Sequence, residues 1–259
     1  MKETKQVLIT VKTYPQPSAK YKEIVCTAGV CADGALIRLY PFPFRDLNDY
    51  EKFKKFQWIT VDVEKSQKDP RPESYAAFPE SLKLGDVIES KHWDKRMQSV
   101  LKIDPRFSMC HLNTLESKER SLAVIRPRKI IDFTYEKDTS AWTPKQQEDL
   151  RELWLDRPIS TLKKIPWKFK YKYFCSNPNC NSHNQTIEEW EVFQLYLKMV
   201  KKYNESVALE KVKETYLGKL CSSKRDPHFF VGMHNKYKGV WMIISIISPP
   251  KQDRQLFLM

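Results

Sequence analysis

Apolar and polar positions alternate along much of the N-terminal part of the chain. The alternating runs are rich in Val, Ile, Thr and aromatic residues, and turn-forming stretches such as PQPS and ADGA separate them. This pattern is typical of β-strands with one buried face. Strands are predicted at 6–14, 21–30, 34–45 and 56–66. Their length and spacing favour a small, closed or strongly curved antiparallel sheet.

Helical periodicity is strongest in the C-terminal part. A helix is predicted at 144–157, after an N-cap at Thr143. The clearest helical pattern covers 186–202, where Thr186 and Glu189 have the spacing of a capping box. Further predicted elements are helices at 93–101 and 206–220 and a β-hairpin at 228–247. The mixture of strands and helices predicts an α+β fold.

The chain is strongly basic. Its 259 residues include 45 Lys and Arg against 32 Asp and Glu, which gives a formal net charge of +13. Such an excess attracts polyanions, so nucleic acid, either DNA or RNA, is the expected partner. The longest apolar run, at 240–247, is far shorter than the ~20 residues that span a bilayer. With no signal-peptide pattern at the N-terminus, a cytoplasmic location without a membrane partner is expected.

A short loop of cysteines and a histidine is the most specific chemical signal. Cys175, Cys180 and His183 lie within nine residues, between a predicted strand and a predicted helix. Thiolate and imidazole groups at this spacing are typical of a tetrahedral zinc site. The positive end of the following helix favours the thiolate form. The sequence therefore predicts a zinc knuckle, against the alternative of a polar loop with two incidental cysteines.

A fourth ligand must come from elsewhere in the chain. Cys221 is the preferred candidate, because two antiparallel helices would return it to the loop, and His228 and His234 are the alternatives. A third thiolate would close the coordination sphere, so the zinc ion is expected to be structural rather than catalytic. The remaining cysteines are expected to be ordinary semi-buried thiols: Cys26, Cys31 and Cys110.

Aromatic residues alternate with lysines just before the knuckle, from Trp167 to Tyr173. On a strand this places the aromatic rings on one face and the lysines on the other. One interpretation is an aromatic core face under a solvated lysine face. The other is a surface that follows a phosphate backbone or stacks bases. The predicted nucleic-acid-binding residues are Arg38, Arg45, Arg71, Lys163, Lys164, Lys168, Lys170 and Lys172.

Common catalytic motifs are absent from the sequence, including the phosphate-binding loop, the dinucleotide fingerprint and the zinc-protease motif. No catalytic residue is predicted, and whether the protein is an enzyme stays open. A metal-dependent nuclease is an alternative function, with Glu64 or Glu89 among its carboxylates. A protein-protein adaptor with a basic surface is a second alternative.

Three stretches, VCTAGV, GALIRLYPFPFR and LGDVIES, resemble the N-terminal half of uncharacterised prokaryotic dual-OB-domain proteins. The resemblance implies an OB-like small β-barrel and no particular reaction. The sequence therefore predicts a strand-rich OB-like domain at 1–140 and a zinc-knuckle α+β domain at 141–259. Charge and resemblance together favour a nucleic-acid-binding protein, the recognition component of a microbial DNA-processing or phage-defence system. Base specificity, strandedness and oligomeric state are left open.

Overall fold

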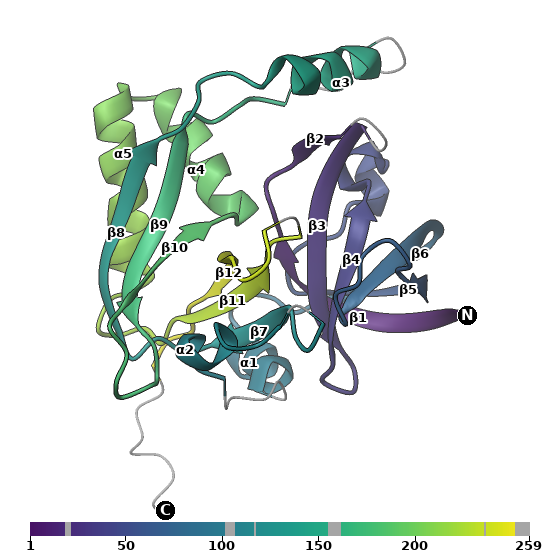
Figure 1. Cartoon of the computed structure of the whole chain (residues 1–259), viewed down its shortest axis with the longest axis horizontal. Helices are drawn as coiled ribbons and strands as arrows, with labels where there is room; N and C mark the ends of the chain where they lie inside the picture. The colour runs from purple at the N-terminus through teal and green to yellow at the C-terminus, as the bar shows by residue number, and fades with distance from the viewer. Residues whose placement is uncertain (19–21, 102–106, 117, 155–161, 236, 252–259) are drawn as a thin grey trace, which may run out of the picture.

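The chain folds into two six-stranded β-sheets that follow one another along the sequence, with helices packed around them (Figure 1). The computed structural model describes residues 1–18, 22–101, 107–116, 118–154, 162–235 and 237–251. The α+β class predicted from the sequence is confirmed. No helix in these described ranges is long and apolar enough to cross a membrane.

The first sheet forms a closed β-barrel of five strands with one short additional strand. Its spatial order is β1-β5-β6-β4-β3, and β1 pairs back onto β3, while β2 lies outside the ring against β3. The β4–β6 pair is parallel and the other pairs are antiparallel. The strands are β1 (Lys2–Lys12), β2 (Gln16–Ser18), β3 (Lys22–Cys31), β4 (Leu36–Phe42), β5 (Gln57–Lys65) and β6 (Ser74–Val87).

Strand β1 closes the barrel because it pairs with two neighbours at once. Its first part, Lys2 to Leu8, pairs with β5, and its second part, from Val7 onward, pairs with β3. A Cβ added at Gly29 would overlap the Leu8 carbonyl oxygen, so the seam between β1 and β3 requires a residue without a side chain. The predicted alternation is confirmed on β5, where Ile59, Val61 and Val63 are fully buried.

The second sheet repeats the strand order of the first. With the six strands of each sheet numbered in chain order, both sheets read 1-5-6-4-3-2, and in both the pair of the fourth and sixth strands is parallel. The strands of the second sheet are β7 (Leu122–Ile125), β8 (Lys129–Lys137), β9 (Trp167–Phe174), β10 (His183–Ile187), β11 (His228–Met233) and β12 (Trp241–Ile247).

The two edges of the second sheet are β7 and β8, which are consecutive in the chain. Only residues 126–128 separate them, a distance of no more than about 14 Å even when fully extended. The second sheet therefore curls until its edges lie near each other. The sheets part between Val87 and Leu122 rather than at the predicted boundary of 140/141, because β7 and β8 pair within the second sheet.

Helices occupy the connections. Two of them, α4 and α5, lie side by side along the β8–β9 face, whereas α3 stands at the far end of the molecule (Figure 1). The helices are α1 (Trp93–Leu101), α2 (Met109–Leu112), α3 (Pro144–Trp154), α4 (Trp190–Val200) and α5 (Glu205–Lys213). Two 3-10 turns, η1 (Phe44–Asp46) and η2 (Asp49–Glu51), follow β4, and a π-helical turn, η3 (Glu214–Lys219), continues α5.

The strongest predicted helix begins later than its capping signal indicated. Thr186 lies in β10 opposite Lys170 of β9, so strand pairing overrides the local capping box. Glu189 is the N-cap residue but makes no side-chain cap. Its buried carboxylate instead lies 2.5 Å from Lys55 Nζ of the barrel and accepts the Ile246 N–H at 2.9 Å. The residue predicted as a cap therefore joins the two sheets.

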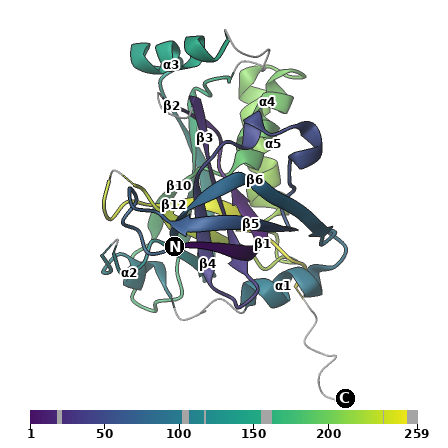
Figure 2. The same cartoon turned by 90° about the vertical axis from the view of Figure 1, so that its right-hand side faces the viewer.

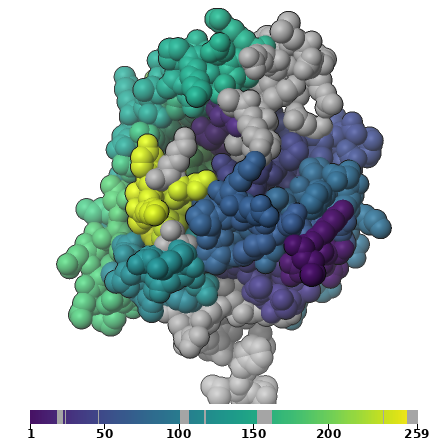
Figure 3. Space-filling model, turned by 45° about the vertical axis from the view of Figure 1, so that its right-hand side comes forward, coloured from purple at the N-terminus to yellow at the C-terminus, as the bar shows by residue number. Residues whose placement is uncertain are grey.

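Backbone and guanidinium contacts complete the junction between the sheets. Figure 2 looks onto the barrel with the second sheet behind it, and Figure 3 shows the yellow C-terminal residues reaching the surface beside the barrel. Arg38 of β4 donates to Ser121 Oγ at 2.7 Å and to the Ser121 carbonyl oxygen at 3.0 Å. Arg71 donates to the Met233 carbonyl oxygen at 2.7 Å. The barrel is thus docked against one end of the β7–β11 pair, where the Met233 N–H donates to the Ser121 carbonyl oxygen at 2.9 Å.

Candidate metal centre and basic groove

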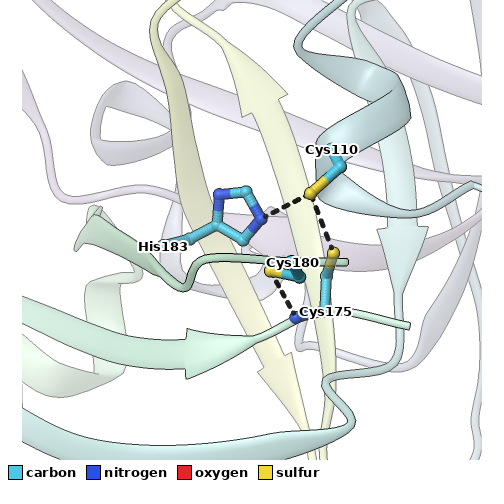
Figure 4. A group of neighbouring side chains, drawn as sticks. All are labelled: Cys110, Cys175, Cys180 and His183. Atoms are coloured by element: carbon cyan, nitrogen blue, oxygen red, sulfur yellow. Dashed lines mark hydrogen bonds between the residues drawn. The ribbon is translucent and has the colours of Figure 1, made fainter. Parts of the chain in front are cut away.

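Four side chains with metal-binding atoms meet beside the second sheet: Cys110, Cys175, Cys180 and His183 (Figure 4). Their ligand atoms all lie within 4.8 Å of one another. Cys110 belongs to α2, Cys175 follows the last residue of β9, and His183 is the first residue of β10. We call this group the Cys3His cluster. Two segments of the chain converge on it: α2 supplies Cys110, and the stretch from the end of β9 to the start of β10 supplies the other three ligands.

The loop between β9 and β10 is shaped to bring its ligands together. Asn177 accepts the Asn179 N–H on its side chain at 2.8 Å and the Cys180 N–H on its carbonyl oxygen at 3.2 Å. The Cys175 N–H points to the Cys180 sulfur at 3.4 Å. Ser182 turns the chain into β10 with a φ of 78°, in the left-handed region. The NPNCNS stretch is therefore a tight knuckle rather than an extended loop.

The spacing of the ligand atoms suits a tetrahedral metal ion. The Cys110 sulfur lies 3.5 Å from the Cys175 sulfur and 3.5 Å from His183 Nε2. Around a tetrahedral ion with bonds of ~2.3 Å to sulfur and ~2.0 Å to nitrogen, these separations would be about 3.8 and about 3.5 Å. The Cys3His cluster could therefore hold a metal ion with little rearrangement.

The electrostatics of the cluster distinguish its cysteines. Burial opposes ionisation of Cys175, but hydrogen bonds from backbone groups of Cys110 and Asn177 and from the His183 side chain outweigh it and lower the pKa to about 6. Burial and the neighbouring sulfur atoms raise the pKa of Cys110 to about 12. The thiolate form is thus favoured at Cys175 and opposed at Cys110.

Residues behind the cluster hold its segments in place. Gln185, two residues after His183 on β10, donates to the Met109 sulfur at 3.2 Å and to the Trp241 carbonyl oxygen at 3.3 Å. Its side-chain oxygen accepts the Tyr173 hydroxyl. Ser108 caps α2 by accepting the His111 N–H at 3.1 Å. These contacts fix α2 against β10 and so position Cys110.

The structure brings together three of the predicted ligands and replaces the fourth. Cys221 lies outside the Cys3His cluster, with its sulfur 3.1 Å from the Tyr216 carbonyl oxygen and 3.5 Å from the Tyr171 hydroxyl. Its expected place in the metal site is wrong because α5 and η3 return the chain to the middle of β9 rather than to its end. Burial raises the pKa of this thiol to about 11.

Cys110 was expected to be an ordinary thiol. It stands 65 residues before Cys175, and no short spacing connects it to the knuckle. The alternative histidines also lie outside the cluster: His228 Nδ1 contacts the Asp226 carbonyl oxygen at 2.8 Å, and His234 Nδ1 accepts the Tyr237 N–H at 3.1 Å. Only the fold brings α2 to the end of β9.

The three arginines predicted to contact nucleic acid have structural positions instead. Arg38 is 1% exposed and Arg71 is 6% exposed. Arg71 forms an ion pair with Asp69 at 2.5 Å, and Arg45 pairs with Glu23 at 2.7 Å. These guanidinium groups belong to the interior and the seams of the fold, so the prediction that they form a binding surface is wrong.

On β9 the aromatic side chains form a core face, which is the first of the two interpretations of the alternating aromatic and lysine residues. Phe169, Tyr171 and Tyr173 are fully buried, so they cannot stack bases. Among the predicted lysines, Lys164 and Lys168 share Asp138 at 2.7 and 3.2 Å, and Lys170 pairs with Glu136 at 2.7 Å. The remaining two, Lys163 and Lys172, are exposed. Most of this face is neutralised by carboxylates of the same half.

The carboxylates considered for a nuclease do not form a metal site. Glu64 lies beside the N-terminal amine, and Glu89 pairs with Lys91. Within the part of the chain that the structure describes, the Cys3His cluster is the one group of three or more Cys, His, Asp or Glu side chains that could hold a metal ion.

A large groove lies beside the break between β7 and β8. It has a volume of about 1540 Å³, and α1, the 126–130 corner and the segments 221–228 and 249–251 line it. Two acidic side chains, Asp94 and Asp226, also line it. Its basic side chains are Lys91, Arg126, Arg128, Lys129, Arg225 and Lys251. Sequence reasoning missed this basic groove, because its cations come from four separate segments.

Three cations of the basic groove have no carboxylate partner among the described residues: Arg128, Lys129 and Lys251. All three are exposed. Arg126 pairs with Asp226 at 2.7 Å, and Arg225 donates to the Ser248 carbonyl oxygen at 3.0 Å. The groove thus keeps a positive charge that its own carboxylates do not neutralise.

Comparison with family models divides the chain close to where the sheets part. Residues 105–259, more than half of the chain, match the model described as Domain of unknown function (DUF8757). The chain belongs to this family. Residues 3–102 match a second model, described as Domain of unknown function (DUF8758). The Cys3His cluster lies within the DUF8757 match, whereas both matched segments line the basic groove. No curated protein matches the chain.

Proposed function

We propose that the protein binds nucleic acid through the phosphate backbone, in the basic groove. The observation that carries the proposal is the set of three exposed cations, Arg128, Lys129 and Lys251, which face the groove without a carboxylate partner in the described chain. A concave site with an excess of positive charge focuses the field on a polyanion. Binding to phosphates releases counterions, which supplies most of the affinity.

The remainder of the basic surface supports the choice of this site. On β9 Lys168 pairs with Asp138 and Lys170 pairs with Glu136. Several exposed lysines elsewhere also have acidic neighbours, such as Lys211 with Glu214 at 3.0 Å. Paired cations contribute little to attraction at a distance. The net charge of +13 is therefore most effective at the groove.

We further propose that the Cys3His cluster binds a structural zinc ion. Soft thiolate ligands with one imidazole select zinc over the hard cations. Four protein ligands would leave no coordination position for a reacting water molecule. The spacing of the four ligand atoms supports this assignment.

The proposal also includes an OB-like barrel. Taken in chain order, the five barrel strands lie in the ring order first, second, third, fifth, fourth, and the third and fifth are parallel. A five-stranded Greek-key barrel of this order is the arrangement of OB folds. The second sheet has the same order when β7 and β8 are counted as one strand interrupted at Pro127. This repetition supports a pair of OB-like units.

Equilibrium binding to a labelled, mixed-sequence oligonucleotide tests the function. The double variant Arg128→Ala/Lys129→Ala should weaken binding at least tenfold at low salt. The slope of log affinity against log salt should become shallower by about 1 to 2, the loss of two phosphate contacts. Binding by the wild-type protein should persist in chelator that removes Mg²⁺, because phosphate contacts need no such ion.

The matched control is Lys201→Ala/Lys202→Ala, which removes the same charge from exposed positions just after α4. It should change affinity and slope far less. Equal effects of the two double variants would show that net charge alone drives binding. No measurable affinity near physiological salt would overturn the proposal and favour the adaptor alternative.

A further inference from the structure

The basic groove combines its cations with a largely apolar interior. Trp93 and Met97 of α1, Phe107 and Ile130 reach it from different segments, and each is partly exposed. We call these four side chains the apolar floor. A site for phosphates alone needs only donors and charge. An apolar floor beneath cations indicates a ligand that is charged along its backbone and apolar between the charges.

The two aromatic rings of the floor are held in place. Trp93 meets Phe56 edge-on with ring centroids 6.2 Å apart, and Arg96 lies 5.1 Å from the tryptophan ring. Phe107 is held in the same way, with Arg120 lying 4.2 Å from its ring centroid. Rings fixed by neighbours lose little conformational entropy when a ligand stacks on them.

Two of the unpaired cations, Arg128 and Lys129, lie along the side of the groove formed by the break in the second sheet. The Arg128 N–H donates to the Phe174 carbonyl oxygen at 2.8 Å, and its guanidinium lies 5.6 Å from the Phe174 ring. Lys129 is the first residue of β8, paired with Phe174. The backbone of the sheet therefore positions these charges.

At about 1540 Å³ the groove exceeds the ~300–1,000 Å³ typical of a site for one small molecule.

We propose that the occupant of the basic groove is single-stranded nucleic acid, with bases stacked on the apolar floor and phosphates on the cations. This inference rests on the proposed function and narrows it. In a duplex the bases stack on one another inside the helix, so a duplex would offer the groove phosphates, sugars and base edges but no base face to stack on the floor. Unpaired bases have apolar faces that stack on aromatic side chains in any sequence.

The test compares a single-stranded oligonucleotide of about 12 nucleotides, within the ~4–16-nucleotide sites of single-strand binders, with the duplex of the same sequence. Inorganic polyphosphate serves as a third probe, since it carries phosphates without bases. The single strand should bind at least tenfold more tightly than the duplex. Trp93→Leu and Phe107→Leu should each weaken single-strand binding roughly 5- to 100-fold, and leave polyphosphate binding within about twofold.

Each outcome has one meaning. Equal or tighter binding of the duplex overturns the single-strand inference, while the phosphate-binding function stands. Equal losses for the single strand and polyphosphate would show that the floor supports the groove rather than the bases, which also overturns the inference. If none of the three probes binds, the proposed function fails with it. Because Trp93 and Phe107 each pack against a core cluster, thermal unfolding checks both variants. If one of them is unfolded, the variant that stays folded decides.

Discussion

The two sheets have one strand order but hold their edges in different ways. In the barrel the single strand β1 runs through the closure, with Lys2 to Leu8 on β5 and Val7 onward on β3. In the second sheet the corresponding position is divided into β7 and β8 at residues 126–128. A backbone ladder closes the first sheet. Beside the divided strand of the second sheet lies the Cys3His cluster, which joins α2 to the ends of β9 and β10.

This difference indicates what an interrupted strand makes possible. A continuous strand has its backbone groups committed to its neighbours. The break at Pro127 instead places Arg126, Arg128 and Lys129 at a corner that faces the basic groove. The second sheet thus gains a corner of basic side chains where it loses ladder hydrogen bonds. We infer that side-chain ligands to a metal restore the stability that the ladder no longer supplies.

The largest effect is expected on removing a ligand of the proposed zinc ion. Cys175→Ser should abolish zinc binding and destabilise the second sheet by several kcal/mol, because structural zinc contributes on the order of 10 kcal/mol to folding. Hydrogen exchange should accelerate along β9 and β10, while β1, β3 and β5 stay protected. Elemental analysis of the purified protein should fall from about one zinc ion per chain to none.

The chain supplies a matched control for that experiment. Cys221→Ser alters a cysteine outside the Cys3His cluster, so its zinc content should stay at the wild-type level. Cys110→Ser should behave like Cys175→Ser. Loss of zinc in Cys221→Ser with retention in Cys110→Ser would refute the assignment of the fourth ligand. Loss of protection throughout both sheets would show that they unfold as one unit.

A smaller loss of stability is expected from a substitution at the seam between β1 and β3. Gly29→Ala should destabilise the protein by about 1–3 kcal/mol, because the new methyl group would force β1 and β3 apart at the Leu8 carbonyl oxygen. Exchange should accelerate on both sides of the seam, and zinc content should not change. Urea unfolding measures the loss, with Gly218→Ala as control, since a Cβ there meets no atom within 4 Å. Equal stability of the two variants would contradict the steric account of the seam.

The sequence was informative where structure is local. Alternation located β1, β3, β4 and β5 of the barrel and the buried face of β9, and the spacing of Cys175, Cys180 and His183 located the knuckle. Both signals arise from residues that are neighbours in the chain. Their periodicity survives folding because each sheet buries one face of these strands.

The errors all concern contacts between distant segments. Arg38 looks like a surface cation in the sequence, and only the approach of Ser74 and Ser121 gives its guanidinium group buried partners. Cys110 could not be connected to the knuckle without knowing that α2 packs on β10. The basic groove needed the positions of four segments at once. Local pattern specifies elements, whereas tertiary packing decides which polar groups meet.

The smallest expected effect concerns the junction of the two sheets. Glu188 follows β10, and its carbonyl oxygen accepts the Tyr14 N–H at 3.0 Å. Burial raises the pKa of its carboxyl group to about 7, with Asp138 adding to the shift and Lys164 and Lys168 opposing it. A carboxyl group with a raised native pKa binds more protons folded than unfolded. Its contribution to stability is therefore complete at low pH and is lost as the pH rises from about 4.5 through about 7.

Glu188→Gln removes this titration and keeps the shape of the side chain. Relative to wild type, the variant should gain on the order of 1 kcal/mol in unfolding free energy between pH 5 and pH 8, a reduced figure because the side chain is partly exposed. Urea unfolding at both pH values measures the difference. Parallel pH profiles for the two proteins would mean that Glu188 is ionised without cost in the native state. If the unfolding free energy of the wild-type protein falls more steeply between pH 5 and pH 8 than that of Glu188→Gln, the junction between the sheets is a part of the molecule whose stability changes near neutral pH.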